Sequence, residues 1–467
     1  MADPPQLLWA PQAWLDGRWR DAVLLRVAAD GRWAEVRPDA PVPAGALRLS
    51  GPVLPGLVNA HSHAFQRAFA GLAERRAQAH DDFWSWRDHM YRVALRIGPE
   101  QLEAVASQLF AELLRGGYTQ VCEFHYLHHE RDGARYADPL TMSRALVRAA
   151  ARAGIGLTLL PVLYQRAGFA QAGLRDDQRR FASSVEDVMR WRDAVRAQRS
   201  PRVHAGVAIH SLRAAAPASI AALVEACAGD DGPIHIHVAE QTGEVDDCLA
   251  ATGERPIQWL AQHAALDARW QLVHATHASA DEIDAVARSG AGVVLCPSTE
   301  ANLGDGVPDL PRWLAAGVPL SVGSDSQITR AWREELRWLD YAQRLSLRRR
   351  NVAAAPEAGV PSTAQRLFDA TLAGGARAAG FSHWGLSVGA PADLLVIDRD
   401  DASLLGLPIM HWLDALVFSS PGRPWRDVLC GGRWVVREHR HADGDAIARD
   451  FTAAMATLGL DSSQAVA

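Results

Sequence analysis

The 467-residue sequence contains no lysine, and all 48 of its Lys and Arg positions are arginine. This absence excludes the chemistries that need a lysine amine, such as a pyridoxal Schiff base or the lysine of a phosphate-binding loop. It also excludes the carbamylated lysine that bridges the two metals of many binuclear hydrolases. A catalytic metal site in this chain would therefore be a single-metal site built from histidines and carboxylates.

Long apolar runs are also missing, because no stretch of about 18 apolar residues occurs. The first residues, Met1–Pro5, lack the basic and apolar regions of a secretory signal. The five cysteines are odd in number and far apart, which is typical of reduced thiols. A net charge of −6 gives no basic surface for nucleic acid or an anionic membrane. We expect a cytoplasmic protein with neither of these partners.

Apolar content of 48% and charged content of 22% are ordinary for a globular protein, and the length suits one large domain with a smaller companion. Both ends carry short apolar runs interrupted by residue pairs such as Asp16-Gly17, a pattern typical of β-hairpin turns. We expect the two ends, residues 1–52 and 385–467, to form one small β-sandwich domain, with a helix at the C-terminus. Residues 53–384 would form the large domain.

The middle of the chain alternates apolar runs with helical patterns, which predicts βα units and a parallel sheet. We expect eight strands, at residues 53–60, 119–124, 155–163, 203–209, 233–238, 271–274, 291–297 and 318–323. The clearest helical patterns between them cover 100–115, 139–153, 217–228, 280–289 and 332–348. Eight βα units predict an α/β fold of the TIM-like (β/α)8 barrel type, with the active site at the C-terminal ends of the strands.

Histidines and carboxylates follow several of these strands. His61 and His63 are two residues apart on one strand, so both side chains point to the same face. His237, His274 and Asp325 lie at the ends of the fifth, sixth and eighth predicted strands. Each one alone is compatible with a core position, but their convergence at one barrel mouth favours a metal site. Such ligands suit one divalent metal per chain, zinc first and Fe²⁺ as the alternative.

These residues also carry a family resemblance. Four segments resemble the metal-binding motifs of the amidohydrolase superfamily, in its branch of mononuclear deaminases: 55–63, 237–240, 273–275 and 323–325. The resemblance covers nearly the whole chain and implies four metal ligands: His61, His63, His237 and Asp325. It further implies that His274 contacts the activated water and that Glu240 shuttles protons. Chemistry agrees, since Glu240 lies three residues beyond a ligand, where it can protonate a leaving nitrogen, and Asp325 can accept the proton of the water.

The segments around the predicted pocket resemble a narrower deiminase family of this superfamily, which acts on N-formimidoyl-L-glutamate: 83–87, 123–126, 210–213 and 298–306. That likeness implies hydrolysis of this linear amidine to N-formyl-L-glutamate and ammonia, as in L-histidine breakdown. It also implies five substrate-binding residues: Gln66, Arg87, Tyr126, His210 and Arg213. Chemistry supports a small dicarboxylate substrate independently, because the planar guanidinium groups of Arg87 and Arg213 suit bidentate carboxylate binding.

Two other functions remain open at this point. The same metal site would serve a deaminase of a purine or pterin ring, although a neutral ring calls for amide and aromatic groups rather than two arginines. A non-catalytic barrel scaffold is the other possibility, and the complete set of ligands with Glu240 argues against it. By analogy with other barrel hydrolases we also expect a homodimer.

Overall fold

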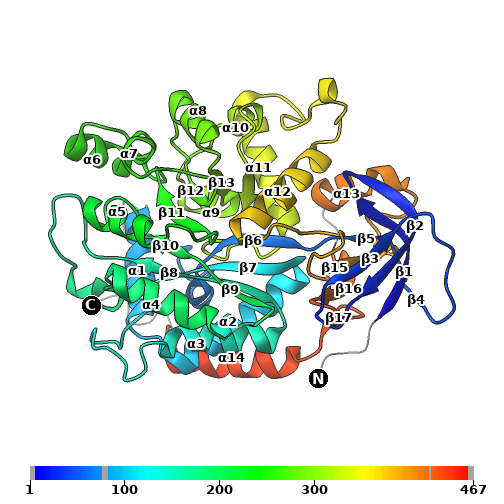
Figure 1. Ribbon diagram of the computed structural model, residues 1–467, viewed down its shortest axis with the longest axis horizontal. Coiled ribbons are helices and arrows are strands. Elements are labelled where there is room, and N and C mark those ends of the chain that lie inside the picture. Colours follow the sequence, from blue (N-terminus) through cyan, green and yellow to red (C-terminus); the bar gives the residue numbers. More distant parts are fainter. Residues whose placement is uncertain (1–5, 76–82, 199, 420–421, 461–467) are drawn as a thin grey trace.

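The computed structural model describes residues 6–75, 83–198, 200–419 and 422–460. Its larger unit is a parallel barrel in which all eight predicted strands are present (Figure 1). The strands are β6 (Leu57–Ser62), β7 (Tyr118–His125), β8 (Gly156–Leu163), β10 (Val207–Ile209), β11 (Ile234–Val238), β12 (Trp270–His274), β13 (Gly292–Leu295) and β14 (Leu320–Val322). The predicted strand at 203–209 is divided, since β9 (Val203–Ala205) precedes β10 and also pairs with β8.

Helices surround the barrel, and the five predicted from the sequence are all present with ends shifted by no more than two residues. They are α2 (Pro99–Arg115), α3 (Thr141–Ala153), α5 (Pro217–Ala226), α8 (Ala280–Ser289) and α11 (Trp332–Leu347). The other barrel-domain helices are α1 (Phe83–Ala94), α4 (Val185–Arg196), α6 (Thr242–Thr252), α7 (Pro256–His263), α9 (Pro297–Leu303), α10 (Leu310–Ala315) and α12 (Thr363–Ala378). Strands β6, β7, β8, β11 and β12 are buried along their whole length, as expected when helices and core residues cover both faces of a parallel sheet.

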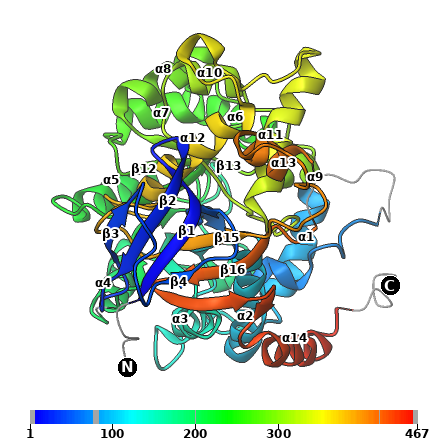
Figure 2. The ribbon, with the colours of Figure 1, turned by 90° about the vertical axis from the view of Figure 1, so that its right-hand side faces the viewer.

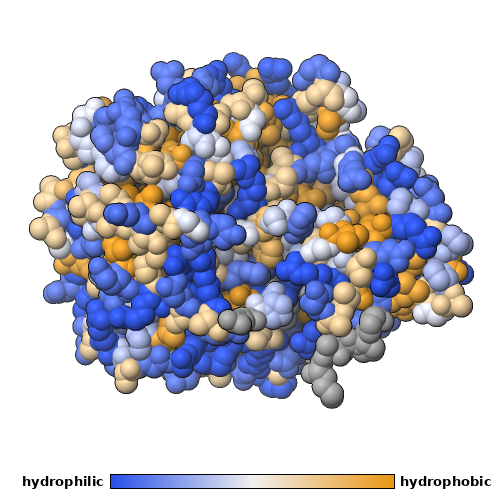
Figure 3. All heavy atoms as spheres, in the orientation of Figure 1, coloured by the Kyte–Doolittle hydropathy of each residue, from blue (hydrophilic) through white to orange (hydrophobic). Residues whose placement is uncertain are grey.

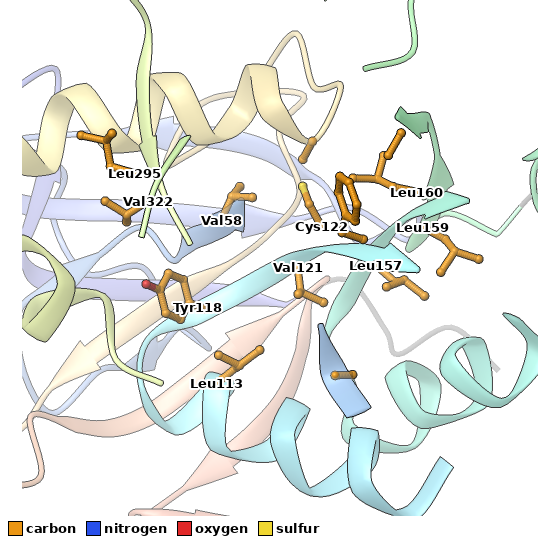
Figure 4. Packing of buried hydrophobic residues seen from close by; sticks show 14 of the residues in the cluster. Val58, Leu113, Tyr118, Val121, Cys122, Leu157, Leu159, Leu160, Leu295 and Val322 are labelled. Carbon is orange, nitrogen blue, oxygen red and sulfur yellow. The ribbon is translucent and has the colours of Figure 1, made fainter. Parts of the chain in front are cut away.

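The barrel core packs tightly against helix α12. In Figure 4, Val58, Leu295 and Val322 lie beneath this helix on neighbouring strands. A side chain on Gly374 of α12 would stand 2.0 Å from the backbone oxygen of Leu320. Glycine therefore allows the helix to approach the sheet directly.

The barrel closes between its first strand, β6, and its last, β14. The side-chain amide of Asn59 donates to Ser324 Oγ at 2.6 Å, and the Ser324 backbone N–H donates back to Asn59 Oδ1 at 2.9 Å. Next along the seam, the Asp325 backbone N–H donates to the carbonyl of His61 at 3.0 Å. Gly323 leaves room for this contact, because a side chain there would lie 2.6 Å from His61 Cβ. Two predicted metal ligands are thus joined through the backbone at the seam.

The two ends of the chain share a second, nine-stranded sheet (Figure 2). Its strands are β1 (Leu7–Leu15), β2 (Arg18–Val27), β3 (Trp33–Arg37), β4 (Leu47–Arg48), β5 (Val53–Leu54), β15 (Leu394–Ile397), β16 (Trp425–Cys430), β17 (Arg433–Arg437) and β18 (Arg440–His441). N-terminal β5 pairs with C-terminal β15, so neither end forms the sheet alone. The predicted barrel strand at 53–60 is therefore wrong at its start, because residues 53–54 pair in this sheet and only β6 enters the barrel. The predicted hairpin turn is present, with φ of 49° at Asp16 and 74° at Gly17.

Helix α13 (Trp412–Phe418) lies between β15 and β16 in the sequence, and α14 (Gly444–Leu458) follows β18 and packs against α2. In the described ranges no helix combines the length and apolar character that a membrane crossing requires. Hydrophilic and hydrophobic residues are interspersed over the face seen in Figure 3.

Candidate active site

The structure brings the four predicted metal ligands together at the C-terminal mouth of the barrel. His61 Nε2 lies 3.1 Å from His63 Nε2 and 3.0 Å from His237 Nε2. Asp325 Oδ1 lies 3.5 Å from His61 Nε2 and 3.4 Å from His63 Nε2. All four residues are buried. Three strands, β6, β11 and β14, thus bring nitrogen and oxygen donors together around His61. The donor atoms of His61, His63 and Asp325 lie within 4.8 Å of one another, and so do those of His61, His237 and His274.

Hydrogen bonds on the far side of two of the rings show that this cluster fits a metal ion. His63 Nδ1 lies 3.0 Å from the carbonyl of Phe124, and His237 Nδ1 lies 3.0 Å from the carbonyl of His210. A carbonyl only accepts, so both Nδ1 atoms carry the proton and both Nε2 atoms present a lone pair. Burial lowers the pKa of His61 to about 3, which keeps its ring neutral as well. Converging lone pairs on neutral imidazoles are what a divalent cation requires.

Asp325 supplies the negative charge of the cluster. Burial by itself would raise the pKa of this carboxyl, but the neighbouring imidazoles, His61 foremost, lower it below its ordinary value. The carboxylate is therefore ionised. Three imidazole nitrogens and one carboxylate are a ligand set that catalytic zinc sites use.

Glu240 and His274 lie beside the cluster. His274 Nε2 lies 3.7 Å from Glu240 Oε1 and 3.8 Å from Asp325 Oδ2. Burial raises the pKa of Glu240 to about 7. For His274, burial acts to lower the pKa, but Glu240 and hydrogen bonds to Cys296 and Glu300 raise it well above its ordinary value. Glu240 can therefore hold or release a proton near neutral pH, beside a charged imidazole.

The backbone turns sharply where these side chains leave their strands. Ala239, His274 and Asp325 adopt left-handed φ values of 52°, 69° and 40°. Such values are uncommon outside glycine and asparagine or aspartate, and they concentrate at functional sites. At the ends of β11, β12 and β14 these conformations turn the backbone at the barrel mouth.

One pocket is lined by three residues of the cluster, His63, His237 and Asp325, and by all five predicted substrate-binding residues. Gln66 enters from the 3-10 helix η1 (Ala64–Ala68), and Arg87 enters from α1. Tyr126, His210 and Arg213 follow the strands β7 and β10. Gln66 Nε2 donates to Tyr126 Oη at 3.3 Å. The two arginines thus line the pocket that holds the predicted metal ligands.

Comparison with known proteins identifies the family. The model of the Amidohydrolase family matches residues 53–435, which is most of the chain. This chain belongs to the amidohydrolase family. This chain is 49% identical over 452 residues to the formimidoylglutamate deiminase of Pseudomonas aeruginosa. The match covers 97% of this chain and 99% of that protein. This chain is 30% identical over 416 residues to the 8-oxoguanine deaminase of the same organism, covering 86% and 85%.

A solved structure agrees with this assignment. The amidohydrolase from Brucella melitensis has a TM-score of 0.92 and 41% sequence identity to this chain, with coverage of 97% of this chain and 99% of that one. The barrel with its companion sheet from both ends is therefore the fold that the sequence predicts.

The sequence patterns missed several residues of this amidohydrolase site. Tyr164 directly follows β8 and lines the pocket, so the strand-end rule that selected His237 could have found it. Tyr91 lies four residues after Arg87 on α1, on the same helix face, and it also lines the pocket. Glu300 of α9, whose Oε1 lies 3.5 Å from His274 Nδ1, carries no signal of its own in the sequence.

Proposed function

We propose that this amidohydrolase hydrolyses N-formimidoyl-L-glutamate to N-formyl-L-glutamate and ammonia. The observation that carries this proposal is that Arg87 and Arg213 line the same pocket as the histidine–aspartate cluster. The substrate has an amidine on its α-nitrogen, a carboxylate on the α-carbon and a second carboxylate at the end of the side chain, which are the groups that such a pocket can bind. The name of the relative at 49% identity supports the same reaction.

The cofactor of this proposal is one divalent metal per chain, zinc first and Fe²⁺ as the alternative. His61, His63, His237 and Asp325 would hold it, since their donor atoms converge. When bound, such a metal lowers the pKa of a coordinated water to roughly 7 and polarises the bond under attack. We name zinc first because catalytic zinc commonly binds histidine nitrogens at sites with an open position.

Side chains of the protein would carry out the proton transfers. Water oxygen adds to the amidine carbon, the bond from that carbon to its terminal nitrogen then breaks, and ammonia leaves. Both protons of the water end on the departing nitrogen, one during the attack and one as the added oxygen becomes the formyl oxygen. Asp325, which is ionised, accepts a proton as the water attacks. Glu240 protonates the leaving nitrogen, and its pKa of about 7 suits a group that must take up and release a proton near neutral pH. His274 lies between both carboxylates and orients the reacting oxygen.

Substrate orientation would come from the opposite side of the pocket. Arg87 and Arg213 bind the carboxylates, and Gln66, Tyr126 and His210 position the rest of the molecule. Burial lowers the pKa of Arg87 from its ordinary value, whereas in Arg213 the nearby Glu244 and Tyr164 outweigh burial and raise it. Both remain cations at neutral pH, since the pKa of a guanidinium is far above 7.

A direct assay tests this function. Metal-replete protein is given N-formimidoyl-L-glutamate, and ammonia release is compared with a panel of purine and pterin rings that includes 8-oxoguanine. We expect rapid release from the linear amidine and little from the rings. Preference for a ring substrate would replace the proposal with the alternative that the 30% identical relative represents.

The metal content gives a separate prediction. We expect one tightly bound divalent metal per chain, because four ligands converge and the sequence has no lysine to bridge a second ion. Elemental analysis of dialysed protein measures the ratio. Two equivalents per chain that both survive dialysis would contradict a mononuclear site.

Arg213 gives a prediction about the substrate. Truncating an arginine that pairs with a buried carboxylate costs about 2–5 kcal/mol. For Arg213→Met we therefore expect a loss of roughly 30-fold or more in kcat/KM on N-formimidoyl-L-glutamate. Turnover of formamidine, which lacks both carboxylates, should scarcely change.

The matched control is Arg312→Met, which removes an arginine from a surface ion pair with Asp284. It should leave both activities intact. Equal losses on both substrates in Arg213→Met would mean that Arg213 supports the fold or the metal cluster rather than the carboxylates.

A further inference from the structure

Two tyrosines of the pocket, Tyr91 and Tyr164, are held by one buried glutamine. Gln178 belongs to the 3-10 helix η2 (Asp176–Phe181) and is 1% exposed. Its side-chain nitrogen donates to Tyr91 Oη at 3.1 Å and to Tyr164 Oη at 3.0 Å. Both phenols line the pocket, whereas Gln178 is not among the residues that line it.

The orientation of the Gln178 amide is fixed by its other end. Gln178 Oε1 accepts a hydrogen bond from the Arg175 backbone N–H at 3.2 Å. A backbone N–H can only donate, so the oxygen must face Arg175 and the NH₂ group must face the phenols. Both phenol oxygens therefore act as acceptors towards Gln178, and neither phenolic proton points at it.

Counting protons then shows what the pair can offer. Each phenol carries one proton, and burial raises the pKa of Tyr164 well above neutrality. Neither proton is used on Gln178, because its NH₂ group is the donor in both contacts. At least one phenolic O–H is therefore available on the side of the pair away from Gln178.

The surroundings of that remaining O–H are cationic. Arg87 Cζ lies 5.5 Å from the centroid of the Tyr91 ring. Arg213 lines the same pocket as Arg87 and the two phenols. An O–H donor beside two guanidinium groups makes this part of the pocket rich in hydrogen-bond donors. This combination suits a carboxylate better than a carboxamide, whose NH₂ group would face other donors there.

We infer that the hydroxyl pair, Tyr91 with Tyr164, donates one O–H to a carboxylate of the substrate, and that Gln178 is the positioning residue that makes the pair a donor. The identity of the dicarboxylate rests on the proposed function. Gln178 touches no substrate in this arrangement. It acts through the phenols and sets the preference of the site for a carboxylate over a carboxamide.

The test measures binding by calorimetry to the metal-loaded protein. The probes are N-formyl-L-glutamate, a dicarboxylate, and N-formyl-L-glutamine, in which one carboxylate is a carboxamide. A hydrogen bond to a charged group is worth about 1.5–3 kcal/mol, so Tyr164→Phe should weaken binding of the dicarboxylate by about 10- to 150-fold. Binding of the carboxamide probe should weaken far less, so the selectivity ratio should fall.

Gln178→Glu is the most informative variant, because it changes a donor to the phenols into an acceptor. The new carboxylate still accepts from Arg175, but it also accepts both phenolic protons, so no O–H is left for the ligand. We expect a loss of selectivity at least as large as in Tyr164→Phe. Adding Tyr164→Phe to Gln178→Glu should cost little more, because the same hydrogen bond is already lost.

Two controls separate this role from folding. Gln178→Met removes the amide without adding charge, and it should lower the selectivity while the temperature of thermal unfolding changes little. Tyr118→Phe removes the hydroxyl of a buried barrel tyrosine that lies outside the pocket, and it should leave binding unchanged. Thermal unfolding of each variant monitors stability.

The outcomes are distinct. Unchanged selectivity in folded Gln178→Glu and Tyr164→Phe would overturn the inference, as would equal losses on both probes. Failure of the wild-type protein to hydrolyse N-formimidoyl-L-glutamate would instead reject the proposed function. In that case the carboxylate preference is still measured by the two binding probes.

Discussion

Replacing Glu240 by glutamine should reduce turnover of N-formimidoyl-L-glutamate about 10²- to 10⁴-fold, the usual contribution of a general acid–base group. Glutamine has nearly the same shape but cannot carry a proton. The pKa of Glu240, raised to about 7 by burial, shows how closely this carboxyl suits proton transfer near neutral pH. Steady-state kinetics together with elemental analysis should show that metal content and KM change little.

Glu225→Gln is the matched control, because Glu225 lies exposed on α5. It should keep full activity. Near-normal turnover in Glu240→Gln would place the proton shuttle elsewhere, with His274 or Asp325 as the next candidates.

For Asp325→Asn we expect a loss of about 10²- to 10⁴-fold even when metal is supplied in excess. The amide keeps the shape of the side chain, and the backbone bond from residue 325 to His61 is unaffected. What it removes is the negative charge among three imidazoles and the group that accepts a proton from water. Kinetics over a range of added Zn²⁺ measures both effects.

Full recovery of Asp325→Asn at high Zn²⁺ would mean that Asp325 only holds the metal and accepts no proton. Partial recovery to a low plateau is the expected result. The plateau itself measures how much of the rate depends on proton acceptance.

The positions of the barrel strands and of the residues that follow them could be predicted from the sequence. A parallel barrel buries each strand on both sides, so apolar runs mark the strands clearly, and polar residues mark their C-terminal ends. His61 and His63 follow from the period of two along a strand. His237 and Asp325 follow from the fact that all parallel strands end at one mouth.

Contacts made between elements could not be predicted in the same way. Gln178 acts only because a short helix places its amide between phenols from α1 and the end of β8. The local sequence pattern around residues 176–181 does not predict that contact. The proton positions on His63 and His237 likewise depend on the carbonyls of Phe124, on β7, and of His210, which directly follows β10. Such pairings follow from tertiary structure and leave no periodic signal.

The seam between β6 and β14 determines when the proposed ligand set can be completed during synthesis. Asn59 and Ser324 pair across the seam although 265 residues separate them, and the proposed ligands His61 and Asp325 lie beside them. Synthesis proceeds from the N-terminus, so a nascent chain presents His61 and His63 long before Asp325 leaves the ribosome. The complete ligand set exists only once almost the whole barrel has been made. For the proposed ligand set we therefore expect metal to bind late, when the barrel is nearly complete.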